Sequence, residues 1–89
     1  MTDQSRADRT TVVAVVEEIW RDVLDVPSGY EDATFIELNG QSITAVLIVN
    51  RIEEELGVVV DIGELFEDPR LDQFIEHVAR LSRESLADR

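Results

Sequence analysis

The chain has 89 residues, enough for one small domain, and 44% of them are hydrophobic, which is typical of a folded protein rather than a disordered tail. The absence of cysteine excludes disulfides, thiolate metal sites and a thiol nucleophile, and it fits a cytoplasmic protein. Twenty acidic residues against eight arginines give a formal net charge of -12, which argues against partners such as nucleic acid or an anionic membrane and favours proteins with basic surfaces.

An apolar periodicity of three and four residues predicts a first helix from about Asp8 to Leu24. Its apolar face consists of Val12, Val13, Val16, Ile19, Trp20, Val23 and Leu24. Pro27 and Gly29 are expected to end it. The polar residues 1–7 before it are expected to form a flexible N-terminus.

Residues 25–41 have no clear period and predict a long loop between the first two helices. Pro-Ser-Gly and Asn-Gly signal turns within it. We expect Phe35, Ile36 and Leu38 to fix this loop to the core. Loops of this length are uncommon in small domains and are often functional.

The second helix is predicted from Ser42 to Leu56, with Gly57 as its stop. One apolar stripe runs along its full length and is expected to face the core: Ala45, Ile48, Val49, Ile52 and Leu56. A second stripe covers only the first half, before a run of three glutamates: Ile43, Val46 and Leu47. This stripe is either an exposed docking surface or a face that another short helix covers, and the residues favour neither.

Residues 58–60 are three valines that we interpret as an extended connector, because a lone strand would have no partner. A short helical turn is expected around residues 62–67, with Leu65 and Phe66 pointing inward and Pro69 ending it.

The last helix is predicted from about Leu71 to Leu81, and residues 83–89 are assigned to a flexible C-terminus. Its apolar face consists of Leu71, Phe74, Ile75, Val78 and Leu81. Residues 8–82 would therefore form one all-α domain. It would have three longer helices and one short third helix around a single core, with the long loop between helices one and two.

The residues present no convincing catalytic or metal site. The one histidine, His77, lies on the predicted last helix, and no serine, histidine and aspartate grouping is evident. One histidine without cysteine excludes a tight zinc site. The acidic residues between positions 61 and 68 lack the spacing of a calcium-binding loop, so we interpret them as a solvated acidic surface.

Ser42 stands where the loop meets the second helix, and it has two interpretations. Serine is among the best helix N-caps, and the local pattern favours that role. Alternatively, its hydroxyl is exposed at the positive end of the helix dipole, where free backbone N–H groups would stabilise an attached phosphate. Gly40 would then let the chain turn sharply and leave room for another protein. No neighbouring residue would deprotonate Ser42, so a separate enzyme would have to supply the base.

The stretch FIELNGQSI, residues 35–43, resembles the serine motif of the carrier proteins of fatty-acid, polyketide and nonribosomal-peptide synthesis. Its first four residues correspond to the lead of the motif, Gly40 to the second glycine and Ser42 to the modified serine. Asn39 and Gln41 depart from the motif, at the first glycine and at the residue before the serine. The resemblance continues through the Leu-Gly corner, the Leu-Phe pair and the following proline, and it covers roughly residues 12–82.

The resemblance implies a four-helix carrier bundle of the free-standing type, monomeric and without catalytic activity of its own. Ser42 would receive a 4'-phosphopantetheine arm from coenzyme A, while Asn39, Gly40 and Gln41 shape the turn. The thiol of the arm would hold an acyl or aminoacyl group as a thioester, in polyketide or nonribosomal-peptide type specialised metabolism.

The resemblance also implies that the start of the second helix meets partner enzymes. The expected contact residues are Ile43, Val46 and Leu47, with Arg51, Glu53 and Glu54 at the rim. Partners would be a phosphopantetheinyl transferase, a loading enzyme (adenylating or acyltransferase) and a downstream synthase, transferase or thioesterase. Because of Gln41, a second hypothesis stays open: an unmodified helical interaction module with a carrier-like fold.

Overall fold

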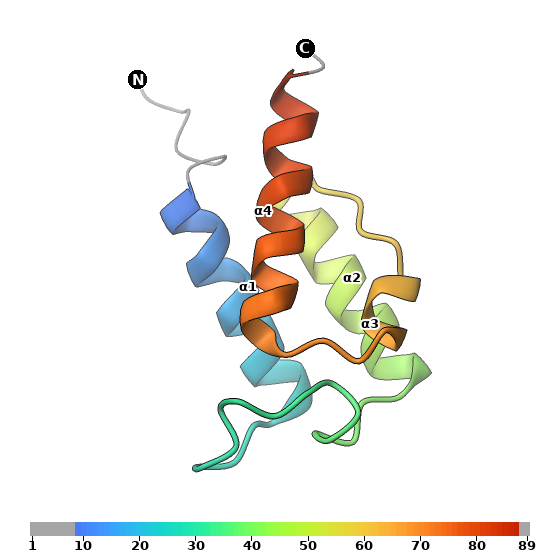
Figure 1. Ribbon diagram of the computed structural model, residues 1–89. Helices are drawn as coiled ribbons and strands as arrows, with labels where there is room; N and C mark the ends of the chain where they lie inside the picture. The colour runs from blue at the N-terminus through green and yellow to red at the C-terminus, as the bar shows by residue number, and fades with distance from the viewer. Residues whose placement is uncertain (1–8, 88–89) are drawn as a thin grey trace.

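The computed structural model describes residues 9–87, which form four helices (Figure 1). In chain order these are α1 (Arg9–Leu24), α2 (Ser42–Leu56), α3 (Gly63–Phe66) and α4 (Leu71–Ala87). This part of the chain contains no strand, although one isolated bridge pairs Thr34 with Arg70. The expected all-α architecture, with a short third helix and a long loop after the first, is confirmed. No helix among the described residues is long and apolar enough to cross a membrane.

Helix α1 packs against both α2 and α4 around one apolar core. Trp20 of α1 is fully buried, and its ring centroid lies 5.8 Å from that of Phe74 on α4 and 6.3 Å from that of Phe35 in the loop. Aromatic pairs at such separations and tilts add attraction beyond their buried area. Trp20 therefore joins α1 both to α4 and to the segment that leads into α2.

The full-length apolar stripe of α2 faces this core, as predicted. Ala45, Ile48 and Ile52 are fully buried, and Val49 and Leu56 pack half-buried against them. The three valines after α2 form an extended connector rather than a strand, which confirms the prediction. Their burial alternates, as expected for an extended chain that runs along a core: Val58 and Val60 are buried and Val59 is exposed.

The prediction that Ile36 helps to fix the loop to the core is wrong. Phe35 and Leu38 are buried, but the side chain of Ile36 is 56% exposed. The reason is a helical turn in the loop, in which Leu38 N donates to Phe35 O at 3.2 Å and Asn39 N donates to Ile36 O at 2.9 Å. In such a turn residues three apart share one face, so Phe35 and Leu38 point inward together and Ile36 points out.

The inward orientation predicted for Phe66 is also wrong. Leu65 is fully buried, whereas Phe66 is 48% exposed. Neighbouring residues of a helix are about 100° apart, so with Leu65 directed at the core the Phe66 side chain points to the edge of this short helix. The Phe66 ring still packs edge-on against Phe35, with the ring centroids 6.4 Å apart.

Helix α4 extends beyond its expected end at Leu81 and continues to Ala87. The continuation is consistent with the sequence, because Ser82 is buried on the helix and no glycine or proline follows before its end. Residues 83–87, assigned to a flexible tail, are therefore helical. The boundary of the domain at residue 82 stays a prediction, and the expected flexible N-terminus lies outside the described residues.

Exposed ion pairs join α1 to both of its neighbours. Arg9 contacts Glu76 of α4, and its guanidinium lowers the pKa of that carboxyl. Asp22 lies 2.7 Å from Arg51 Nη1 on α2 and raises the pKa of the arginine. Water screens both pairs, so we expect them to orient the helices more than to stabilise them.

Candidate functional site

Ser42 is exposed and is the first residue of α2. The N-cap is the residue before it: Gln41 has extended backbone angles, φ -136° and ψ 174°, and its carbonyl accepts the first helical hydrogen bond, from Ala45 N at 2.9 Å. The interpretation of Ser42 as the N-cap is therefore wrong, because Ser42 already lies one residue inside the helix.

Thr44 supplies the capping hydroxyl, a role that the sequence pattern did not predict. Gln41 N donates to Thr44 Oγ1 at 2.7 Å, and the same hydroxyl donates to Gln41 O at 2.8 Å. The usual signal for such reciprocal capping is a glutamate or glutamine three residues after the N-cap, and here a threonine takes that place. The Ser42 hydroxyl is therefore not needed to begin the helix.

We expect Thr44→Val to lower the free energy of unfolding by about 1 kcal/mol, because the cap is lost while the shape of the side chain is kept. Thr44→Ser keeps the hydroxyl and should retain most of the stability. Urea unfolding of both variants measures the difference. Equal midpoints for the two variants would mean that the Thr44 hydroxyl does not stabilise the start of α2.

Asn39 and Gly40 form the turn before Ser42, Asn39 through its backbone angles and Gly40 through its lack of a side chain. Asn39 has φ 64°, in the left-handed region that asparagine tolerates. Gly40 does not have a positive φ, so its backbone angles do not require glycine, contrary to the expectation that its conformational freedom makes the turn. Instead, a Cβ on Gly40 would lie 2.5 Å from the nearest ring carbon of Phe35, so only glycine fits against that ring.

The loop that leads to the serine is held by the segment between α3 and α4. Phe35 N donates to Pro69 O at 2.9 Å, and Ile36 N donates to Asp68 Oδ1 at 2.9 Å. The bridge between Thr34 and Arg70 adds a third link beside them. The loop that leads into the serine turn is therefore held by residues 68–70, which lie far beyond α2 in the chain.

The second stripe of α2 is exposed, which decides between the two interpretations of it. Ile43, Val46 and Leu47 are 67%, 43% and 48% exposed, so no helix among residues 9–87 covers them. Exposed apolar residues gathered on one face of a helix are typical of an interaction surface. We call this set of three residues the apolar patch.

Of the expected rim residues, Glu53 and Glu54 are exposed on the later half of α2, but Arg51 is placed differently. Its guanidinium contacts Asp22 of α1 and, at 3.4 Å, Glu55 of α2. Arg51 therefore joins two helices on the side facing α1, and we leave it out of the proposed contact surface.

His77 is half-buried on α4, and its polar contacts are with α3 and α4 rather than with the serine turn. Its Nδ1 lies 3.8 Å from Glu64 Oε1 on α3 and 3.3 Å from Arg80 Nη2. Within residues 9–87, no three His, Asp or Glu side chains are grouped so that they could hold a metal ion. The geometry therefore presents an exposed hydroxyl at a helix start beside an apolar patch.

Comparison with known proteins finds a family described as "Phosphopantetheine attachment site", whose match covers residues 14–78. The chain is 35% identical over 83 residues to a dimodular nonribosomal peptide synthase of Bacillus subtilis, covering 93% of this chain and 4% of that protein. It is 32% identical over 80 residues to a cyclosporin synthetase of Tolypocladium inflatum, covering 90% of this chain and less than a hundredth of that much longer protein. The chain thus spans only a small part of these curated relatives, and no solved structure matches it significantly.

Proposed function

We propose, from the premise that this chain belongs to the family of phosphopantetheine attachment sites, that Ser42 carries the 4'-phosphopantetheine arm of a peptidyl carrier. Domains of this family are non-catalytic tethers for that cofactor. The observation that carries the proposal is the exposed position of Ser42 at the start of α2, with the capping role taken by Thr44.

The surroundings of Ser42 fit a phosphate ester. The positive end of the α2 dipole lies there, and the first N–H groups of a helix have no acceptor within the helix. Gly40 has no side chain that could obstruct access to the serine hydroxyl. The Phe35 ring fills the space that a Cβ on Gly40 would need. A phosphodiester on the serine oxygen would therefore meet backbone donors and little steric hindrance.

The attachment step needs a separate enzyme, because the one histidine of the chain contacts α3 and α4 residues instead. A phosphopantetheinyl transferase would take the proton from Ser42 Oγ, which attacks the phosphorus that bears the pantetheine in coenzyme A. The bond from that phosphorus to the nucleotide phosphate breaks, and adenosine 3',5'-bisphosphate leaves. When bound, the arm supplies the thiol on which an acyl group is held as a thioester.

We propose an aminoacyl or peptidyl cargo, loaded by an adenylating enzyme and passed to a downstream synthase, transferase or thioesterase. This rests on the relatives, one of which is named as a nonribosomal peptide synthase. A polyketide cargo, a free-standing monomeric chain and a cytoplasmic location stay predictions. The mass and sedimentation of the native protein would check whether the chain is free-standing and monomeric.

We propose that partner enzymes contact the apolar patch, with Glu53 and Glu54 at its rim. A carrier must dissociate from each enzyme after that enzyme has reacted with the cargo. A small contact surface allows such rapid dissociation. The acidic charge of the chain would speed encounters with basic partners without making the complexes long-lived.

Intact mass after incubation with coenzyme A and a broad-specificity transferase tests the attachment. We expect the wild type to gain the mass of one phosphopantetheinyl unit and Ser42→Ala to gain none. Ser28→Ala, which removes an exposed serine elsewhere in the same loop, should be modified fully. If the folded wild type gains no mass with several transferases, the unmodified interaction module is the better hypothesis.

A further inference from the structure

An asparagine followed by a glycine, Asn39 and Gly40, ends the helical turn of the long loop just before the serine. Asparagine is among the thermolabile residues of proteins. Its side-chain amide carbon and the next main-chain nitrogen can close a five-membered ring, and glycine hinders that closure least because it has no side chain. The chain's other asparagine, Asn50, precedes Arg51 within α2 and lacks this advantage.

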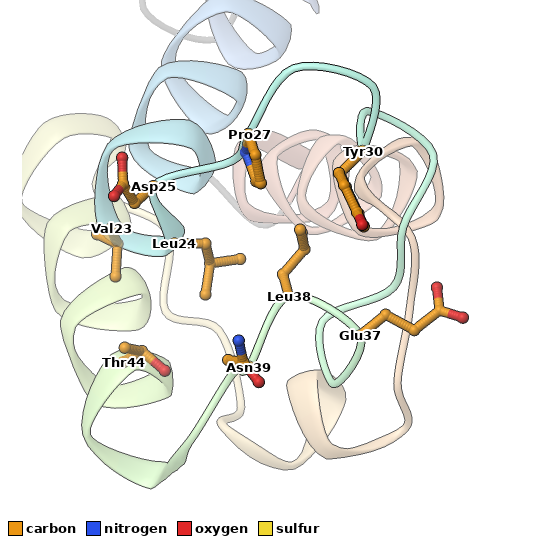
Figure 2. Close-up of a pocket in the computed structure, with 9 residues that line it drawn as sticks. All are labelled: Val23, Leu24, Asp25, Pro27, Tyr30, Glu37, Leu38, Asn39 and Thr44. Carbon is orange, nitrogen blue, oxygen red and sulfur yellow. The ribbon is translucent and has the colours of Figure 1, made fainter.

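Water can reach the side chain of Asn39. This residue is exposed, and in Figure 2 it lies between Leu38 and Thr44. It lines a hollow of about 530 Å³ where the end of α1, the long loop and the start of α2 meet. Nothing in this position shields the amide from water or hydroxide.

The backbone of the two residues has the hydrogen bonds of a common helix ending, with Asn39 as its left-handed residue at φ 64°. Asn39 N donates to Ile36 O and Gly40 N donates to Phe35 O, both at 2.9 Å. Ring closure requires the Gly40 nitrogen to lose its proton before it attacks. The hydrogen bond to Phe35 O must therefore break first, so the closed turn restrains the reaction.

The fold itself requires the glycine that makes this pair reactive. A Cβ at position 40 would lie 2.5 Å from a ring carbon of Phe35, so a bulkier residue, which would hinder ring closure, does not fit there. Position 39 needs a residue that tolerates a positive φ, and asparagine meets this need while it also supplies the reactive amide. The protection of Asn39 therefore depends on the hydrogen bond rather than on a neighbouring side chain.

We propose that Asn39 is a deamidation site whose rate is set by the opening of the serine turn. Gly40 N loses its proton to hydroxide and bonds to Asn39 Cγ, and the side-chain nitrogen takes a proton from water and leaves as ammonia. Water then opens the ring, and no oxidant or reductant is needed. Breaking the new bond between Gly40 N and Cγ leaves aspartate, whereas breaking the bond from Gly40 N to the main-chain carbonyl carbon leaves isoaspartate.

The two products differ in their effect on the turn. Aspartate keeps the main chain, tolerates the left-handed φ and adds a negative charge near the positive end of α2. Isoaspartate lengthens the main chain by one carbon atom between the two N–H groups that close the turn, so their hydrogen bonds cannot both keep their geometry. The isoaspartyl form would display Ser42 on a displaced turn. That this ends the working life of a carrier rests on the function proposed for Ser42.

The rate is measured in a mildly alkaline buffer by tandem mass spectrometry of the digested chain, with an isoaspartyl methyltransferase to label the isoaspartyl product. The unfolded reference is the peptide FIELNGQSI, residues 35–43, in the same buffer. We expect Asn39 to convert about tenfold more slowly in the protein than in the peptide, because the reaction waits for local opening of the loop. Asn50 should not convert in the protein.

The matched variants are Asp68→Gly and Asp68→Asn, which remove the same charge. The Asp68 carboxylate accepts from Ile36 N at 2.9 Å, and both replacements tolerate the φ of 62° at this position. Only asparagine keeps an oxygen for Ile36 N, and it adds no second site of this kind, because the nitrogen of Pro69 carries no hydrogen. We expect Asn39 to convert about threefold faster in Asp68→Gly than in Asp68→Asn, with faster hydrogen exchange at the Gly40 amide.

The effect of each product on the turn is measured separately. Asn39→Asp reproduces the aspartyl product, and chromatography isolates the isoaspartyl form from aged wild-type protein. We expect Asn39→Asp to keep the urea midpoint of the wild type. The isoaspartyl form should unfold at a lower urea concentration and show shifted amide signals for Gln41 and Ser42 in the ¹⁵N-labelled protein.

Conversion of Asn39 at the same rate in protein and peptide, or at the same rate in the two Asp68 variants, would overturn control of the reaction by the turn. Absence of conversion in the protein when the peptide converts would overturn Asn39 as a deamidation site. An isoaspartyl form as stable as Asn39→Asp would overturn the displacement of the turn. None of these measurements uses the transferase, so this proposal and the attachment at Ser42 fail separately.

Discussion

Replacing Gly40 with alanine is expected to destabilise the protein by about 1–3 kcal/mol and to displace the turn that presents Ser42. The added Cβ would lie 2.5 Å from a ring carbon of Phe35, well inside contact distance. The ring cannot retreat easily, because Phe35 is fully buried between Trp20 and Phe66. Urea unfolding measures the loss of stability, and the kcat/KM of phosphopantetheinylation measures the displacement of the turn.

Gly63→Ala is the matched control for this substitution. Its Cβ would meet the Asp61 carboxylate at 3.5 Å, an ordinary contact, in a helix where alanine is favoured over glycine. We expect it to be neutral or slightly stabilising. Combining Gly40→Ala with Phe35→Leu should be less costly than the sum of the two single substitutions, because leucine removes ring atoms from the contact. Unchanged stability of Gly40→Ala would show that this contact does not restrict position 40.

Replacing Leu47 with aspartate is expected to lower kcat/KM for the transferase by about tenfold, without loss of helix content. Truncation of a central contact residue typically costs more than 1 kcal/mol of binding, and 1.4 kcal/mol is tenfold. Leu47 is 48% exposed in the free protein, so we expect its replacement to leave the fold intact. Circular dichroism and the transferase assay together separate the two effects.

Two further substitutions on α2 calibrate that result. Asn50→Asp adds the same charge to an exposed position of the helix without removing apolar surface, and it should retain most of the activity. Ile48→Asp places the charge in the core and should unfold the protein. The patch proposal is wrong if Leu47→Asp unfolds the protein or leaves turnover unchanged.

The helices and the core side of α2 could be predicted because burial imposes a period on the sequence. Trp20, Ile48 and Phe74 each stand on such a periodic face, and each is buried. Ile36 and Phe66 could not be placed in the same way. Each lies in a segment of one turn or less, where there is no period to show which side faces the core.

The candidate site was predictable in position but less so in detail. The apolar pattern predicts a helix that begins at Ser42, whereas the role of Ser42 as an attachment point comes only from the motif that it shares with carriers. Capping by Thr44 depends on which residue takes the N-cap backbone angles, which the residue types around position 42 do not determine. The pairing of Arg51 with Asp22 depends on how α1 and α2 lie together, which no single helix reveals.

The links from residues 34–36 to residues 68–70 have a consequence for the order of events during synthesis. A ribosome makes the serine long before it makes the residues that hold the preceding loop in place. Contacts between distant parts of a chain must wait for the later part to emerge and for the intervening loop to close. A nascent chain that stops before Pro69 would thus display the hydroxyl on an unfinished turn, and a visiting transferase would meet the completed turn only after residues 68–70 have been made.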